Sequence, residues 1–265
     1  MGIFVAVILG AVQGLSEFLP VSSSGHLVLL QKVFGISEPA LFFDTMVHVG
    51  TLAAVFAVLW REIGAILRRP IQPLTAYLAL ATIPAVVFAL VFKDRIEQAF
   101  ESGKMLGAAF LITSALLAVS EMLSKRVMRA KRKKAGEMSW LDALIIGALQ
   151  AAAIIPGVSR SGSTLSGALS RGLDRDFAAR FSFLLSIPAI LGALVLQLKS
   201  PANAAGGIGA APIIAGTLSA AIVGFFAVRL MLNIVKNRSL TGFAVYTAIL
   251  GALVLIDQFG THLVF

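Results

Sequence analysis

Long apolar runs, separated by short polar segments, dominate the chain. A run of about 20 apolar residues is long enough to cross a bilayer as a helix. Six segments reach that length. They are Leu41–Trp60, Thr75–Phe92, Met105–Leu123, Phe177–Leu198, Ile208–Leu232 and Leu240–Phe259. The pattern therefore predicts an all-α integral membrane protein with six transmembrane helices.

Two further apolar regions, residues 1–35 and 140–170, are each interrupted near the middle. The interruptions have the sequences FLPVSSSGHL and IIPGVSRSGSTL. Each half has about 12 residues, which is too short to span a bilayer alone. Such broken segments are tolerated where protein surrounds them or where they face a cavity. We interpret them as two re-entrant pairs of short helices.

The two broken regions resemble each other. The stretch from Gln13 to Gly25 is similar to the stretch from Gln150 to Gly162, and three predicted spans follow each of them. This similarity predicts two repeats within one membrane domain. The expected organisation is a single domain over residues 1–265, with repeat one at about 1–124, a basic cytoplasmic link at 125–138 and repeat two at about 139–265.

The positions of basic residues predict how the repeats are oriented. Seven of the 22 basic residues lie in Lys125–Lys134. Lys and Arg are enriched in cytoplasmic loops, so this link is expected in the cytoplasm. Alternating crossings then place the loops Lys93–Lys104 and Lys199–Gly207 outside. The first broken pair enters from the outer side and the second from the cytoplasmic side, which makes the repeats inverted.

Composition excludes several classes of protein. The chain has 265 residues, of which 58% are hydrophobic and 13% charged, and a mean hydropathy of +0.93. A soluble domain carries about 25% charged residues, so a soluble or disordered chain is excluded. The net charge of +9 is concentrated in one short link, which argues against a nucleic-acid binder. Without cysteine there are no disulfides or thiolate sites. Because the N-terminus lacks a basic region, we predict no cleaved signal peptide.

Five ionisable residues within apolar segments are the main candidates for chemistry: Glu17, His26, Asp44, His48 and Arg160. A charge at the bilayer centre costs at least about 2.5–3.5 kcal/mol, so such residues default to functional hypotheses. Four of the five lie in or just after the first broken pair, and Arg160 lies in the second. If the two breaks meet, these groups converge on one site.

Spacing suggests roles for the first set. Gln13 and Glu17 share a helix face, and Glu17 is a candidate general base or cation ligand, with an interhelical hydrogen bond as the alternative. His26 is a candidate proton relay or a structural histidine. Asp44 and His48 are also four residues apart, and they form either a polar interhelical contact or a metal pair. Each serine that follows Pro20 either caps a helix or acts as a nucleophile. These serines are Ser22, Ser23 and Ser24.

The second break has the character of an anion site. Glycines allow close backbone approach, a helix N-terminus presents free N–H groups, and Arg160 adds a bidentate phosphate fork. The alternative is an ion pair between Arg160 and Glu17 or Asp44. Both can be true, because the ion pair can hold Arg160 in place before the ligand binds. Further along, a mixed-sign cluster is interpreted as a solvated boundary with internal ion pairs, and His262 as a surface residue. The cluster comprises Arg171, Asp174, Arg175, Asp176 and Arg180.

The stretches QGLSEFLPVSSSGHL, PGVSRSGSTLSGAL and RDFAARFSFLLSIPAI resemble the undecaprenyl-pyrophosphate phosphatase family of the bacitracin-resistance type. ATIPAVVFAL and YTAILGALVL extend the resemblance over nearly the whole chain. The resemblance implies hydrolysis of undecaprenyl pyrophosphate to the monophosphate carrier lipid of bacterial cell-wall synthesis, and hence bacitracin resistance. It also implies a multi-pass protein of the bacterial cytoplasmic membrane, a site open to the periplasmic side and a divalent cation, Mg²⁺ or Ca²⁺.

The resemblance also implies roles for particular residues. The expected catalytic residues are Glu17, Ser23, His26 and Arg160, with Glu17 also the candidate metal ligand. Together with the anion site predicted from the two breaks, the resemblance gives the expected substrate-binding residues, which are Gln13, Ser22, Ser24, Gly157, Ser159, Ser161 and Gly162. Two positions depart from the family pattern. Gln13 stands at an acidic position and cannot act as a base. The span after the first break has Asp44 and His48 where the family commonly has Glu and Gln.

These residues predict attack on the pyrophosphate by Ser23, with Glu17 or His26 taking its proton, and direct attack by water is the alternative. The expected partners are the lipid substrate and membrane lipids, with no nucleic acid, and a homodimer is left open. The rival function is a lipid-phosphate flippase or anion transporter, since inverted repeats with broken helices are typical of transporters.

Overall fold

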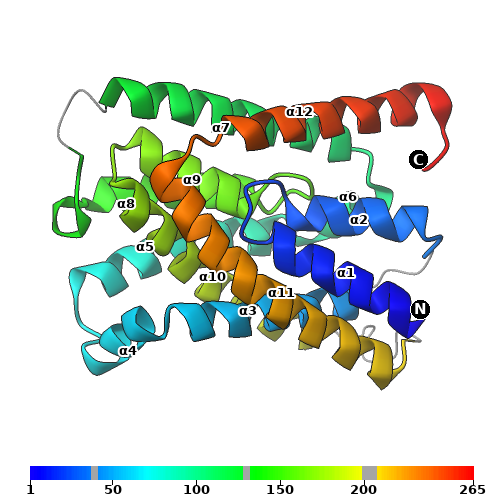
Figure 1. Cartoon of the computed structure of the whole chain (residues 1–265), viewed down its shortest axis with the longest axis horizontal. Coiled ribbons are helices and arrows are strands. Elements are labelled where there is room, and N and C mark those ends of the chain that lie inside the picture. The colour runs from blue at the N-terminus through cyan, green and yellow to red at the C-terminus, as the bar shows by residue number, and fades with distance from the viewer. Residues whose placement is uncertain (37–40, 128–131, 199–207) are drawn as a thin grey trace.

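A computed structural model describes residues 1–36, 41–127, 132–198 and 208–265 of the chain, and within these residues the regular elements are helices (Figure 1). The first half contains α1 (Ile3–Ser16), α2 (Ser23–Val33), α3 (Leu41–Val58), α4 (Trp60–Arg68), α5 (Pro73–Val91), α6 (Lys93–Ser102) and α7 (Leu106–Val127). The second half contains the short η1 (Ala135–Glu137), then α8 (Trp140–Ala152), α9 (Arg160–Ser170), α10 (Arg175–Leu198), α11 (Ala210–Asn237), α12 (Thr241–Ile256) and η3 (Asp257–Thr261).

The predicted spans are confirmed. In the described residues, α5, α7, α10, α11 and α12 are each long and apolar enough to cross a membrane, and α3 with α4 makes a sixth candidate bent by 80°. The bend follows Leu59, and α4 exposes Trp60 while burying Ile63. We therefore interpret α3 as the span and α4 as an amphipathic helix along the membrane surface.

Two corrections concern the segments between spans. The predicted outer loop Lys93–Lys104 is largely the helix α6, and the segment after Leu59 is α4. Both helices are short and rich in charge, so a search for long apolar runs does not find them. Residues 128–131 of the predicted basic link and the whole predicted loop Lys199–Gly207 lie outside the described residues.

Both broken pairs are confirmed as short helices separated by a break. The first break joins α1 to α2 and contains Pro20; the second joins α8 to α9 and contains Pro156 and Gly157. Gly157 has φ +94°, a conformation that a side chain disfavours. Serine side chains cap both second helices, because Ser22 accepts from the Gly25 N–H and Ser159 from the Gly162 N–H.

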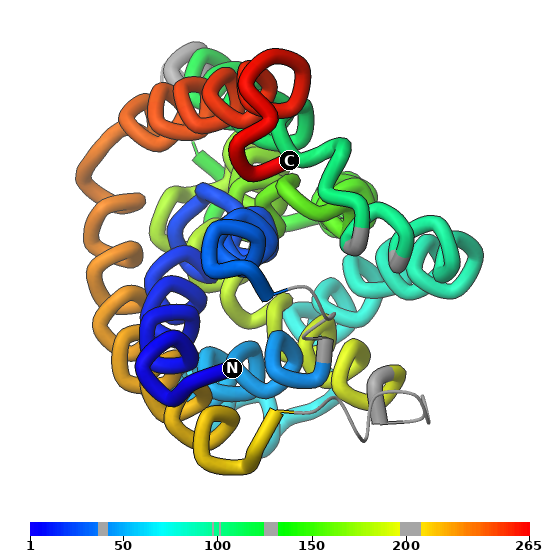
Figure 2. The backbone as a smooth tube through the Cα atoms, turned by 90° about the vertical axis from the view of Figure 1, so that its right-hand side faces the viewer, coloured from blue at the N-terminus to red at the C-terminus, as the bar shows by residue number. Residues whose placement is uncertain are grey.

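The helices of the two halves pack in matching pairs. α1 packs on α11 as α8 packs on α5, α3 contacts α10, and α7 contacts α12. When each helix is replaced by its counterpart in the other half, the α1–α11 pair becomes the α8–α5 pair, and the other two pairs map onto themselves. We propose the two-repeat organisation on that basis. Figure 2 shows the short helices of both broken pairs in the interior, with longer helices around them.

Glycines allow α1 to pack closely on α11. A Cβ atom at Gly10 would clash with the backbone of Gly216, and one at Gly14 would lie 2.7 Å from the carbonyl oxygen of Ala220. Small residues at such crossings let helix backbones approach each other in a membrane. This contact fixes the end of α1, where Glu17 lies.

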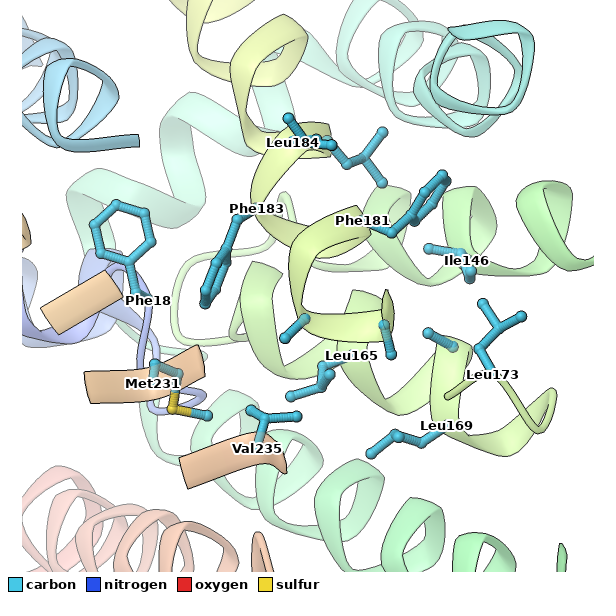
Figure 3. Close-up of a cluster of buried hydrophobic side chains, with 14 of the residues drawn as sticks. Phe18, Ile146, Leu165, Leu169, Leu173, Phe181, Phe183, Leu184, Met231 and Val235 are labelled. Atoms are coloured by element: carbon cyan, nitrogen blue, oxygen red, sulfur yellow. The ribbon is translucent and has the colours of Figure 1, made fainter. Parts of the chain in front are cut away.

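The largest hydrophobic cluster includes side chains of α8 and α9, the two helices that flank the second break. Figure 3 shows aromatic and aliphatic side chains of α8, α9, α10 and α11 in one cluster, with Phe18 at its edge beside Phe183. The rings of Phe18 and Phe183 meet edge to face with centroids 5.4 Å apart. Because Phe18 follows Glu17 directly, this packing holds the first break against α10.

The interpretation of residues 171–180 as a boundary with internal ion pairs is confirmed for Asp176 and Arg180, which pair with each other, and is wrong for the buried Arg175. Arg175 is only 8% exposed, lies 3.3 Å from the Glu121 carboxylate of α7 and donates to the carbonyl oxygens of Val235 and Arg238. Arg180 pairs with Asp176 on its own helix but also with Glu62 of α4. Glu121 and Glu62 lie on other elements, so local spacing does not reveal these two partners.

Asp142, in the first turn of α8, holds the start of the second broken pair. Its carboxylate accepts from Arg171 Nε at 2.7 Å, Lys133 Nζ at 2.9 Å and Ser139 Oγ at 2.9 Å. Burial acts to raise the pKa of Asp142, but the backbone N–H of Ser139 and these three side-chain donors outweigh it and hold the pKa at about 2. The negative charge therefore persists at neutral pH and joins α8 to the residues that follow α9.

Candidate active site

The two breaks meet inside the protein, as the sequence predicts. Ser161 Oγ donates to the Leu19 carbonyl oxygen at 3.0 Å, and a Cβ atom at Gly25 would lie 3.0 Å from the Cα atom of Gly157. Thr113 of α7 supports the second break, since its hydroxyl donates to the Gly157 carbonyl oxygen at 3.2 Å. Glycine is required at both tips because the backbones nearly touch.

Glu17 is the centre of the site. Its carboxylate is 6% exposed and accepts hydrogen bonds at both oxygens. Oε2 accepts from Ser23 Oγ at 2.6 Å and from Gln13 Nε2 at 2.9 Å, and Oε1 accepts from Arg160 Nη2 at 2.7 Å. Arg160 also donates from Nη1 to the Ser182 carbonyl oxygen at 2.9 Å. A serine hydroxyl, a carboxylate and a guanidinium from two breaks are thus joined in one network.

A pocket of about 320 Å³ opens onto this network. The polar side chains that line it come from both breaks and from α3: Glu17, Ser22, Ser23, Ser24, Asp44, Thr45, His48 and Arg160. The apolar wall is formed by Leu27, Phe100, Ala153, Ile154, Val158, Ala189, Ile190 and Ala193. A cavity with convergent polar groups and an apolar wall is suited to a ligand with a charged head and a hydrocarbon tail.

Asp44 and His48 form interhelical contacts, the first of the two arrangements that the sequence allows. Asp44 Oδ1 accepts from Gln31 Nε2 of α2 at 2.7 Å. His48 Nδ1 lies 2.6 Å from the Asp44 carbonyl oxygen, and Nε2 lies 3.5 Å from Glu17 Oε2. The sequence pattern does not predict that His48 lies beside Glu17, although the departure of His48 from the family pattern is a signal.

His26 lies apart from this network. Its Nδ1 is 2.7 Å from the Ser22 carbonyl oxygen, and its Nε2 is 2.7 Å from the hydroxyl of Tyr246 on α12. The ring stacks on Tyr246 and meets Phe110 edge to face. His26 is absent from the pocket lining. The structure therefore places it in an aromatic contact between α2, α7 and α12.

The predicted substrate-binding residues fall into two groups. Ser22 and Ser24 line the pocket, and Gln13 lies fully buried behind Glu17. The others hold the second break in shape, as the Ser159 cap, the Ser161 contact and the positive φ of Gly157 show. The lining of the pocket does not include Gly157, Ser159, Ser161 or Gly162.

The donors around Glu17 do not fit the cation site that the resemblance implies. Both carboxylate oxygens already accept hydrogen bonds, and one of the donors is a guanidinium that would repel a cation. Across the part of the chain that the structure describes, no three side chains of His, Cys, Asp or Glu are grouped as a metal site. The side chains around Glu17 therefore serve a carboxylate that accepts hydrogen bonds, and not a cation ligand.

Comparison with known proteins identifies close relatives. The family described as Bacitracin resistance protein BacA matches residues 6–253. An undecaprenyl-diphosphatase of Carboxydothermus hydrogenoformans is 48% identical over 97% of this chain and 98% of its own length. Undecaprenyl-diphosphatase 4 of Bacillus thuringiensis subsp. konkukian is 47% identical over 96% of both chains. An undecaprenyl-diphosphatase of Methanosphaera stadtmanae is 40% identical over 97% of this chain and 98% of its own.

Proposed function

The chain belongs to the BacA bacitracin-resistance family, and we propose that it hydrolyses undecaprenyl pyrophosphate to undecaprenyl phosphate and inorganic phosphate. One observation in the structure supports the proposal in addition to the similarity to named relatives. Ser23 Oγ donates to Glu17 at 2.6 Å beside the guanidinium of Arg160, and all three residues line one pocket. A hydroxyl with an adjacent base and a phosphate-binding cation is the equipment that phosphoryl transfer needs.

The reaction regenerates the carrier lipid of bacterial cell-wall synthesis, and this recycling is the basis of bacitracin resistance. The pyrophosphate binds at the polar side of the pocket. The lipid tail lies along the apolar wall that α10 and Phe100 contribute. Moving the tail to this wall costs little free energy, because the tail passes from one apolar environment to another.

In the proposed mechanism, Ser23 Oγ attacks the terminal phosphorus while its proton passes to Glu17. The Oγ–P bond forms, the bond from that phosphorus to the bridging oxygen breaks, and undecaprenyl phosphate leaves with the electron pair. Water then attacks the phosphorus of the phosphoserine, the P–Oγ bond breaks, and Glu17 returns its proton to the serine oxygen. Both protons of the water stay on the inorganic phosphate that is released. Two of the five N–H groups of Arg160 are used by Glu17 and Ser182, which leaves three for the phosphate.

We expect a phosphoserine at Ser23 to be trapped by rapid acid quench during turnover of a ³²P-labelled prenyl pyrophosphate. Ser23→Ala should form no labelled protein and should lower kcat by about 10²-fold or more, since the nucleophile is lost. The buried Ser186→Ala, outside the pocket, serves as a matched control and should behave as wild type. Near-normal turnover of Ser23→Ala without labelled protein would instead establish direct attack by water.

We also propose that the pocket opens to the periplasmic side of the bacterial cytoplasmic membrane. Its lining includes Asp44 and His48 near the start of α3, Ala193 near the end of α10, and Phe100 of α6. Charge distribution assigns these helix ends to the outer side, because the basic link after α7 is expected in the cytoplasm.

The purified chain in detergent should release inorganic phosphate from undecaprenyl pyrophosphate, and this release is the direct test of the proposed function. Transport across a membrane is impossible in a detergent micelle, so phosphate release separates a phosphatase from a flippase or anion transporter. A colorimetric phosphate assay measures it, with the Arg160→Ala variant as the control for contaminating phosphatases. Binding of the lipid without phosphate release would favour the transporter.

A further inference from the structure

We propose that His48 binds the pyrophosphate of the substrate together with Arg160, as a second phosphate-binding residue of the site. The inference rests on the proposed function. It concerns a residue on α3, outside both breaks, whose contact with Glu17 the sequence pattern did not anticipate.

The orientation of the His48 ring is fixed by one hydrogen bond. Nδ1 lies 2.6 Å from the carbonyl oxygen of Asp44. A carbonyl oxygen only accepts, so Nδ1 carries a hydrogen and donates it. Nε2 is therefore the nitrogen available to a ligand. The side chain of Asp44 accepts from Gln31, which holds this turn of α3 against α2.

Nε2 of His48 faces the reacting groups. It lies 3.5 Å from Glu17 Oε2, the oxygen that also accepts from Ser23. The His48 side chain is 27% exposed, against 15% for Arg160 and 6% for Glu17, so it is the most accessible of these three pocket residues. A ligand in the pocket can therefore reach Nε2 without displacing a protein contact at normal hydrogen-bond distance.

His48 and Arg160 flank the same carboxylate. Arg160 binds Oε1 of Glu17, while His48 and Ser23 lie beside Oε2. A phosphate placed for attack by Ser23 Oγ therefore lies close to both basic side chains. Two donors from different helices, α9 and α3, can hold a pyrophosphate group in one orientation relative to the serine hydroxyl.

The charged groups that line the pocket also favour a second phosphate-binding residue. A pyrophosphate ester carries at least two negative charges at neutral pH, and the carboxyl groups of Glu17 and Asp44 line the same pocket. Among the described residues that line the pocket, Arg160 is the only lysine or arginine. Its charge is already paired with Glu17. His48 is the remaining lining residue that can carry a positive charge, and in its protonated form it donates from Nε2 to a phosphate oxygen.

The test compares His48→Leu and His48→Gln with wild type in detergent. It measures kcat, KM and the dissociation constants of two probes, a prenyl methylenebisphosphonate and the matching prenyl monophosphonate. His48→Leu removes the donor and should raise KM and weaken the bisphosphonate by about tenfold, with a smaller change for the monophosphonate. His48→Gln keeps an N–H donor and should recover part of the loss. His262→Leu replaces an exposed histidine outside the pocket and should match wild type.

Unchanged bisphosphonate affinity in His48→Leu would overturn the proposal, whether or not kcat falls, because a fall in kcat alone means that His48 acts only by positioning Glu17. Size-exclusion chromatography checks that each variant is folded, and His48→Asn, whose amide is too short to reach, replaces His48→Leu if that variant aggregates. If wild type releases no phosphate, the proposed function fails. If wild type is active and His48→Leu is indistinguishable from it, only this inference fails.

Discussion

Glu17→Gln is expected to lower kcat for undecaprenyl pyrophosphate by about 10³-fold. A positioned general base contributes about 10²–10⁴-fold to proton transfer, and Glu17 is the group within reach of the Ser23 proton. Glutamine has nearly the same shape but cannot accept that proton. Its amide also presents donors to Gln13 or Arg160, where the carboxylate accepted. Phosphate release in detergent, followed at saturating substrate, measures the loss.

A matched control for this variant is Glu62→Gln. Glu62 also pairs with an arginine, Arg180 of α10, but it lies on α4 and does not line the pocket. Its substitution should leave kcat and KM unchanged. Removing one partner of a buried ion pair costs about 3–5 kcal/mol of stability, so the thermal unfolding midpoint of Glu17→Gln should be measured beside its activity. A folded Glu17→Gln protein with kcat within tenfold of wild type would exclude Glu17 as the base.

The membrane explains why most of the fold could be predicted. The bilayer fixes the length of a spanning helix, so the six spans follow directly from apolar runs such as Thr75–Phe92. Proline and glycine then mark the two breaks. The helices α4 and α6 were not predicted, because a helix at the membrane surface needs only one apolar face. Their nine and ten residues of mixed polarity form no distinctive apolar run.

The site was predictable where burial forces a partner. An acid at Glu17 and a cation at Arg160 cannot lie unpaired among apolar helices, and the structure joins them at 2.7 Å. The two histidines could not be assigned in this way. His26 follows Ser23 by three residues, yet its ring bonds to Tyr246, which lies 220 positions further along the chain. His48 reaches Glu17 only because α3 packs beside α1.

Arg160→Ala is expected to lower kcat/KM by about 10³-fold, the range in which a single arginine stabilises phosphoryl-transfer transition states. The guanidinium joins both parts of the site, because it holds Glu17 with one N–H and keeps others for the phosphate. Arg160→Lys retains a positive charge but not the planar fork, so it cannot bind the carboxylate and the phosphate with the same geometry. We expect it to remain at least tenfold below wild type.

The control for both variants is Arg229→Ala, which removes an exposed arginine of α11 that contacts the ring of Phe225 and lies outside the pocket lining. It should hydrolyse undecaprenyl pyrophosphate at the wild-type rate. Arg160→Ala also leaves Glu17 buried without its cation, so its unfolding midpoint should fall more than that of Arg160→Lys. Hydrolysis by folded Arg160→Ala near the wild-type rate would contradict the mechanism. The phosphate would then have to be bound by the serine hydroxyls and His48 alone, and the ion pair with Glu17 would be purely structural.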